Sequence, residues 1–164
     1  MNRRDNTWRS VGVLILLLAL HFYVRPRLGT PRFAPDFIAI GVLLYALRAR
    51  PGQAAVAGLL AGLLTDALTP ARFGAGALAN AVVGYLAAYG RSVFFADNLL
   101  VTGGFFFVGT WLRNLLVLIA SGTPLSQLVM DAGVWSSLQA LSTAVVGVML
   151  ALLLRGWLDL RIRE

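Results

Sequence analysis

The chain has 164 residues, of which 59% are hydrophobic and 13% charged, and its mean hydropathy is +0.78. This balance lies outside that of soluble globular domains and predicts an integral membrane protein. The net charge of +7 comes from arginines that lie mostly between apolar runs, a pattern typical of membrane topology and not of a nucleic-acid-binding surface. Cysteine is absent and His21 is the single histidine, which excludes disulfides, thiolate metal sites and multi-histidine sites.

The first two apolar segments each raise a question about whether they span the membrane. Residues 10–24 follow three arginines, as a signal peptide would, but residues 25–32 (RPRLGTPR) offer no small-residue cleavage site, so we expect a retained span. Residues 35–49 have an uncharged core of only eleven residues. A re-entrant or interfacial segment is one interpretation. We favour a full span, because Pro35 suits a helix start and Arg48 can reach the interface.

The third and fourth segments form a predicted hairpin. Residues 53–68 carry Asp66 near their end, and residues 74–90 are free of charge. The connection TPARFG, residues 69–74, is a short Pro/Gly turn. The two helices are therefore expected to run antiparallel as neighbours.

The last two segments, residues 98–121 and 132–155, are long enough to span without further argument, since a span needs about 20 apolar residues. Together the six segments predict an all-α integral membrane protein, a compact bundle of six transmembrane helices. We expect residues 1–164 to form one transmembrane domain. No extramembrane segment is long enough for a separate soluble domain.

The arginines predict the orientation of this bundle. With both termini in the cytoplasm, nine arginines fall in cytoplasmic segments and four in outer ones, as the positive-inside rule prefers. The cytoplasmic set is Arg3, Arg4, Arg9, Arg48, Arg50, Arg91, Arg155, Arg161 and Arg163, and the outer set is Arg25, Arg27, Arg32 and Arg72. We therefore expect a multi-pass protein with cytoplasmic N and C termini.

Small residues form a stripe on the third predicted helix. Ala54, Gly58 and Gly62 recur at spacings of four, and Gly84 belongs to a similar stripe on the fourth helix. Such stripes allow two helix backbones to approach closely. They indicate either packing between this protein's own helices or a face for a partner's transmembrane helix.

Four polar residues are predicted to lie in the outer half of the membrane: Asp36, Asp66, Arg113 and Asn80. A charged residue within a span is costly unless it is paired or near water. We expect a buried polar cluster in which Arg113 bridges Asp66 or Asp36, because its guanidinium fits a carboxylate. The alternative is that the two aspartates are solvated at helix ends, with Asp36 favoured by the dipole of the helix that follows it.

Motifs for catalysis are missing. The sequence has no HExxH, no GxSxG in a strand-turn-helix setting and no Gly-rich loop followed by lysine. A protease dyad of Asp36 and Asp66 is disfavoured because both residues are expected near helix ends. We therefore predict no catalytic residue, no metal ligand and no cofactor.

Four sequence elements together resemble the MreD family of bacterial rod shape-determining membrane proteins. They are PDF (residues 35–37), YALRARPG (45–52), GLLAGLLTDAL (58–68) and FGAGALANAVVGYLA (73–87). The resemblance implies a non-enzymatic scaffold of the cell-elongation machinery in the bacterial inner (cytoplasmic) membrane, supporting lateral peptidoglycan synthesis and rod shape. It implies that the chain binds MreC, through its transmembrane helix and its periplasmic domain. Through MreC it implies indirect association with MreB, RodA and a class B penicillin-binding transpeptidase.

The resemblance also supplies a competing function. The family is similar in fold to the substrate-binding subunits of energy-coupling-factor vitamin transporters. Those subunits carry an Ala-xxx-Ala pattern in their first helix, whereas this chain has VGVLILLLALHFYV, with Leu and Val in place of the alanines. This departure favours the scaffold. A small-molecule pocket at Asp36, Asp66 and Arg113 is the alternative.

Overall fold

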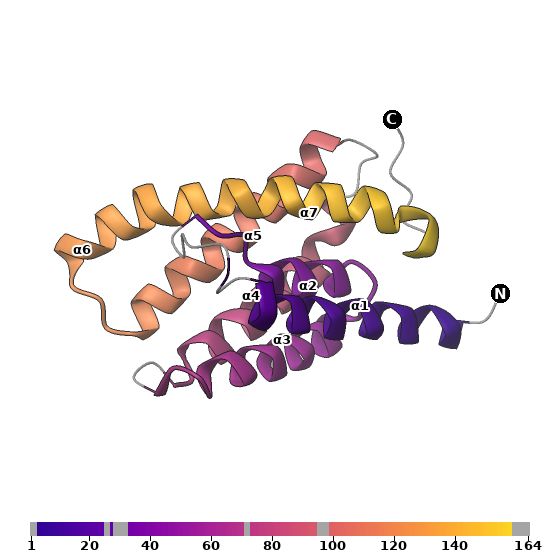
Figure 1. Ribbon diagram of the computed structural model, residues 1–164, viewed down its shortest axis with the longest axis horizontal. Coiled ribbons are helices and arrows are strands. Elements are labelled where there is room, and N and C mark those ends of the chain that lie inside the picture. The colour runs from indigo at the N-terminus through magenta and orange to yellow at the C-terminus, as the bar shows by residue number, and fades with distance from the viewer. Residues whose placement is uncertain (1–2, 25–26, 28–32, 71–72, 95–98, 159–164) are drawn as a thin grey trace.

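The computed structural model describes residues 3–24, 27, 33–70, 73–94 and 99–158 (Figure 1). Its elements in chain order are α1 (Arg3–Val24), α2 (Phe37–Ala46), α3 (Pro51–Asp66), α4 (Ala75–Phe94), α5 (Leu99–Ala120), α6 (Leu125–Met130), the π-helical turn η3 (Asp131–Trp135) and α7 (Ser136–Leu158). Within these ranges the protein is all-helical and contains no strand, which confirms the predicted class. Asn98, the first residue of the predicted fifth helix, lies outside the described residues, as do Arg25, Arg32, Arg72, Arg161 and Arg163.

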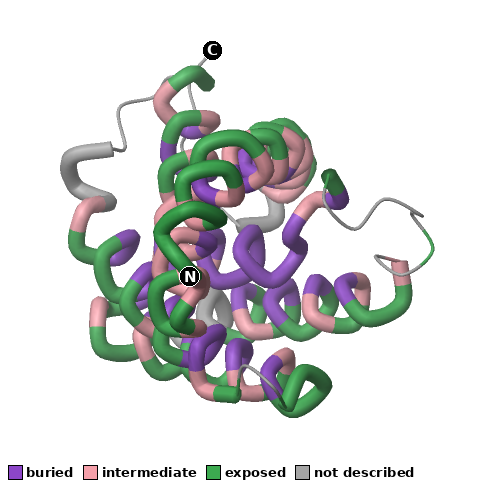
Figure 2. The backbone as a smooth tube through the Cα atoms, turned by 90° about the vertical axis from the view of Figure 1, so that its left-hand side faces the viewer, coloured by how far each residue is buried: buried purple, intermediate pink, exposed green. Residues whose placement is uncertain are grey.

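The second helix lies at the centre of the bundle. α2 contacts α1, α3, α4, α5 and α7, and every one of its residues except Tyr45 is buried. Figure 2 shows the buried positions gathered inside the bundle, with exposed positions on the outward faces of the surrounding helices. A helix buried on all sides needs no polar face, which explains the unbroken apolar run from Phe37 to Leu44.

The helix within the predicted span of residues 35–49 is shorter than expected. α2 has ten residues, about 15 Å of helix, which is half of the roughly 30 Å hydrocarbon core. The helix begins after Asp36 and gives way to a turn at Leu47, so the charges that border its core mark its limits. Such a short helix is tolerated within a membrane protein because its ends are surrounded by protein rather than lipid.

The sixth predicted segment is longer than expected. α6, η3 and α7 form a continuous helical rod in which the π-helical turn separates a short exposed helix from a long one (Figure 1). Two stretches of the described chain, Leu99–Ala120 and Leu125–Leu154, combine the length and apolar composition of a membrane span. The other apolar helical stretches, Trp8–Val24, Phe37–Ala46 and Ala75–Gly90, are shorter.

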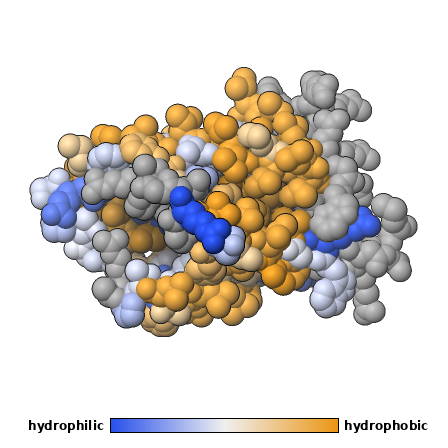
Figure 3. Space-filling model, in the orientation of Figure 1, coloured by the Kyte–Doolittle hydropathy of each residue, from blue (hydrophilic) through white to orange (hydrophobic). Residues whose placement is uncertain are grey.

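The surface of the bundle is apolar over most of its described area. Large hydrophobic side chains are exposed on every long helix, including Leu60 on α3, Leu86 on α4, Val108 on α5 and Val145 on α7. In Figure 3 hydrophobic residues cover much of the visible face, while hydrophilic residues lie at its left and right ends and at one place near its middle. α1 begins and α7 ends on the same side of the molecule (Figure 1). An apolar belt between polar ends is the surface that a lipid bilayer requires.

Candidate functional site

Asp36 is the N-cap of α2. Its backbone is extended (φ −89°, ψ 91°), and its Oδ1 accepts hydrogen bonds from the backbone N–H groups of Ile38 and Ala39, each at 3.1 Å. Aspartate is among the best N-cap residues because it satisfies donors that have no partner within the helix. The carboxylate also lies where the helix dipole favours negative charge. The PDF sequence therefore starts α2 at a defined residue.

The same carboxylate holds α1 and α5 against α2. Arg113 Nη1 of α5 lies 3.1 Å from Asp36 Oδ2, and His21 Nδ1 of α1 lies 3.5 Å from Asp36 Oδ1. Asp36 is fully buried, and the side chains of Arg113 and His21 are 14% and 9% exposed. An ion pair this deep contributes little net stability relative to apolar residues, but loss of one partner leaves a buried charge uncompensated. The pair therefore fixes the relative position of the helices.

A chain of hydrogen bonds continues from Arg113 to α7. Arg113 Nη1 donates to Asn114 Oδ1 at 3.2 Å, and Asn114 Nδ2 donates to Gln139 Oε1 at 2.9 Å. Gln139 Nε2 in turn donates to the carbonyl of Ala34, at 3.3 Å, in the segment before α2. The hydrogen bonds therefore lead back to the segment that contains Asp36, and they link α5 and α7 to the start of α2.

Thr143 of α7 completes this arrangement. Its hydroxyl accepts the backbone N–H of Asp36 at 3.0 Å and donates to the carbonyl of Gln139 at 2.7 Å. Thr143 is fully buried. Neither Thr143 nor Gln139 was predicted from the sequence. The signal was nevertheless present, because Ser136, Gln139 and Thr143 recur at spacings of three and four and so share one helix face.

Asp66 has a different role from the one expected. Its Oδ2 accepts the backbone N–H groups of Gly74 and Ala77, both at 2.9 Å, so the last residue of α3 caps the beginning of α4. Gly74 has a positive φ of 95°, which glycine adopts without strain. A Cβ at Gly76 would collide with Asp66 Oδ1, so a larger residue there would displace the capping carboxylate. Asp66 thus fixes the α3–α4 hairpin.

The four residues of the predicted cluster consequently separate into two groups. Arg113 meets Asp36, whereas the hydrogen bonds of Asp66 within the described chain go to the start of α4. Asn80, 1% exposed, donates from Nδ2 to the carbonyl of Gly76 in its own helix at 2.9 Å. Of the two expected partners of Arg113, Asp66 or Asp36, the structure places Asp36 beside it. The hairpin brings Asp66 to the start of α4, where backbone N–H groups have no acceptor within their own helix.

The small-residue stripe of α3 faces α4 of the same chain. A Cβ at Gly58 would collide with the backbone of Asn80, and one at Gly62 with the backbone of Ala77. In the opposite direction, a Cβ at Gly84 would lie 2.5 Å from the carbonyl oxygen of Ala54. Ala54, Gly58 and Gly62 are all buried. The stripe is covered by α4, so it offers no surface to a partner's helix.

The contacts of Asp36 link helices to one another. Both carboxylate oxygens are engaged, one by two backbone donors and one by Arg113. Among the described residues no group of three or more His, Cys, Asp or Glu side chains could hold a metal ion. What the site does is connect α1, α2, α5 and α7 at one buried point.

Comparison with known proteins identifies the family. The chain matches the family described as rod shape-determining protein MreD over residues 2–161, nearly its whole length. Neither the curated proteins nor the solved structures yield a match. The matched region contains the Asp36 network and the α3–α4 hairpin with its Asp66 cap. The chain is therefore a member of the MreD family of rod shape-determining proteins, which are membrane proteins.

Proposed function

We propose that this protein is a non-enzymatic scaffold that binds the transmembrane helix of MreC in the bacterial inner membrane and thereby supports peptidoglycan synthesis along the cell's length. Membership of the rod shape-determining family supports this role. The observation that carries the proposal is that two buried carboxylates hold the bundle's own helices together. Asp36 pairs with Arg113, and Asp66 caps α4.

A scaffold of this kind would present an exposed apolar face to MreC. The covered stripe of α3 is unsuitable, whereas α7 exposes Leu141, Val145 and Met149 by 56%, 56% and 58%. These residues recur at spacings of four, so they lie on one side of the helix. Packing between membrane helices depends on such complementary side-chain surfaces. This face of α7 is the surface to which we assign the MreC helix.

The test is co-purification from membranes of the tagged protein with untagged MreC, followed by native mass spectrometry. A stoichiometric complex that is lost in Val145→Trp and kept in Leu100→Trp supports the proposal. Leu100 on α5 is the matched control because it is exposed on another helix, by 83%. A lone protomer that carries a vitamin-sized molecule would instead support a substrate-binding subunit of a transporter.

A further inference from the structure

Two buried polar groups on α5 have no hydrogen-bond partner among the described residues. One is the hydroxyl of Thr110, which is fully buried, and the other is Nε of Arg113, one turn further along the helix. Buried polar atoms in folded proteins are nearly always bonded, either to protein or to ordered water. Thr143 and Ser137 of α7 donate their hydroxyls to the carbonyl four residues earlier, whereas Thr110 does not. The two groups on α5 therefore point to a further partner.

α5 and α7 meet in two pairs of residues that define how their faces align. Asn114 Nδ2 donates to Gln139 Oε1 at 2.9 Å. Further along the contact Phe106 faces Gly147, where an added Cβ would lie 2.8 Å from the phenyl ring. The two pairs are eight residues apart on each helix. Because residues four apart share one face of a helix, the positions midway between the pairs face each other.

Thr110 and Thr143 occupy these midway positions, and both are fully buried. The hydroxyl of Thr143 accepts the N–H of Asp36 and donates to the carbonyl of Gln139, so one of its two lone pairs remains. Helical side chains tilt toward the N-terminus of their helix, so Arg113 lies over the turn that contains Thr110. Two donors on α5 and one acceptor on α7 are thus expected at the same level.

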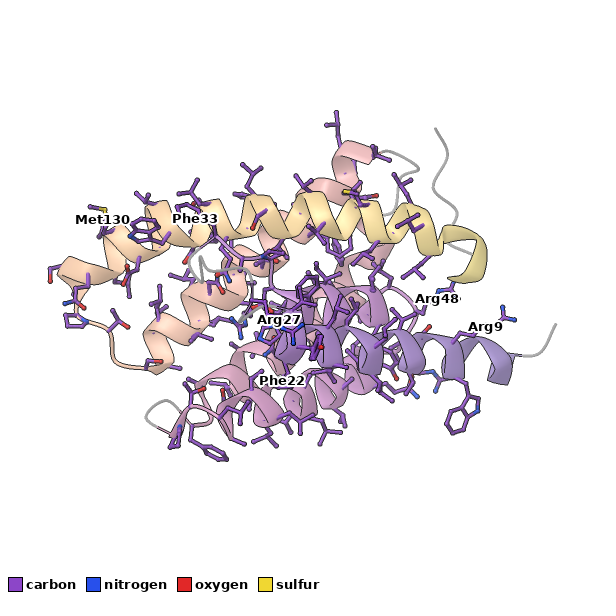
Figure 4. The ribbon with its side chains drawn as sticks, viewed as in Figure 1. Arg9, Phe22, Arg27, Phe33, Arg48 and Met130 are labelled. Atoms are coloured by element: carbon purple, nitrogen blue, oxygen red, sulfur yellow. The ribbon has the colours of Figure 1, made fainter. Side chains whose placement is uncertain are left out.

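The segment before α2 covers α7 beside Thr143. Ser142 Oγ donates to the carbonyl of Phe33 at 2.8 Å, and the ring of Phe33 meets Trp135 edge to face, with centroids 5.6 Å apart. Figure 4 shows Phe33 against the rod formed by α6, η3 and α7. With the two threonines fully buried, a molecule between them is separated from lipid and has to be small.

We propose that one buried water molecule bridges Thr110, Thr143 and Arg113. The water accepts hydrogen bonds from the Thr110 hydroxyl and from Nε of Arg113, and it donates one to Thr143 Oγ1. About three hydrogen bonds are typical of a buried water. An anion is a poorer occupant, because the charge of Arg113 is already paired with Asp36 at 3.1 Å. The bridge fixes one edge of the guanidinium and directs Nη1 toward Asp36.

X-ray radiolytic footprinting of the full chain in detergent tests this site. X-rays split bound water into hydroxyl radicals that oxidise adjacent side chains, and mass spectrometry locates the oxidation. We expect oxidation of Phe106, one turn from Thr110. Ile38 is the internal control, since it is equally buried but packs against Leu14 of α1 and Ala61 of α3. Oxidation of Phe106 should fall at least fivefold in Thr110→Val, which removes the hydroxyl at nearly constant volume, and should persist in Thr110→Ser, which keeps it.

Two outcomes would overturn the bridge. The first is oxidation of Phe106 no greater than that of Ile38 in the wild type, a result that needs no variant to fold. The second is equal oxidation of Phe106 in the wild type and in a folded Thr110→Val protein, which would show that Thr110 holds no water and that its hydroxyl bonds within its own helix. Both measurements use the isolated protein, so they do not depend on the proposed binding of MreC.

Discussion

Asp36 and Arg113 meet at 3.1 Å in the interior of the bundle, although 77 positions in the sequence separate them. The carboxylate starts α2 through one oxygen and receives the guanidinium of α5 through the other. Capping alone would leave its charge buried and unpaired, and pairing alone would not define where α2 begins. One side chain therefore sets both the start of the central helix and its position relative to α5.

Arg113→Ala is expected to destabilise the protein by about 3–5 kcal/mol, because the Asp36 charge would remain buried without its partner. Unfolding in mixed micelles of increasing denaturing detergent measures the loss. Arg27→Ala is the control, since Arg27 lies over the exposed ring of Tyr23, 4.0 Å from its centroid, and its removal leaves no buried charge. Equal stability of the two variants would show that Asp36 does not depend on Arg113.

Asp66→Ala is expected to cost about 1–2 kcal/mol, the usual loss for an N-cap, since the N–H groups of Gly74 and Ala77 lose their acceptor. Asp66→Asn is expected to retain most of the stability, because an amide oxygen accepts the same hydrogen bonds. Thermal unfolding in detergent, followed by helical circular dichroism, compares the two. If Asn were as damaging as Ala, the charge of Asp66 and not its capping would be the important property.

Gly62→Leu is expected to prevent close packing of α3 on α4 and to reduce the yield of folded protein severely, since a Cβ already collides with the backbone of Ala77. Gly104→Leu on α5 is the matched control, because a Cβ there meets nothing within 4 Å. Size-exclusion chromatography of the two variants in detergent gives the comparison. A monodisperse, stable Gly62→Leu protein would contradict the backbone contact.

Thr143→Val removes one hydroxyl at nearly constant volume. Asp36 N–H then loses its acceptor in a fully buried environment, so we expect a loss of about 1–3 kcal/mol. Ser137→Ala, which removes a hydroxyl that donates to the carbonyl of Gly133 in the preceding π-helical turn, is expected to be close to neutral. Denaturation of both variants in the same detergent series distinguishes them, and equal midpoints would remove Thr143 from the network.

Interactions between neighbours in the sequence could be predicted, whereas interactions between distant segments could not. Asp36 lies directly before an apolar run, so its favourable place at a helix N-terminus was predictable from local sequence. The partner of Asp66 was not, because several donors lay at a similar predicted depth and only the tight hairpin brings the start of α4 to it. The eleven uncharged residues already indicated the length of α2. The predicted helix was longer because a full span was assumed, and it therefore included the charges on either side.

Neutralising both members of the buried pair separates their role in holding the helices from any role of their charges. In Asp36→Asn/Arg113→Gln the amide oxygen at position 36 can still cap α2 and the NH2 group beside it can donate to an amide oxygen at position 113, while no charge remains buried. If the pair serves only to hold a scaffold together, this double variant will retain MreC and restore rod shape to cells that lack the protein, and Arg113→Ala will not. A folded, abundant double variant that leaves the cells round would show that the charges themselves are needed, and would contradict the scaffold account.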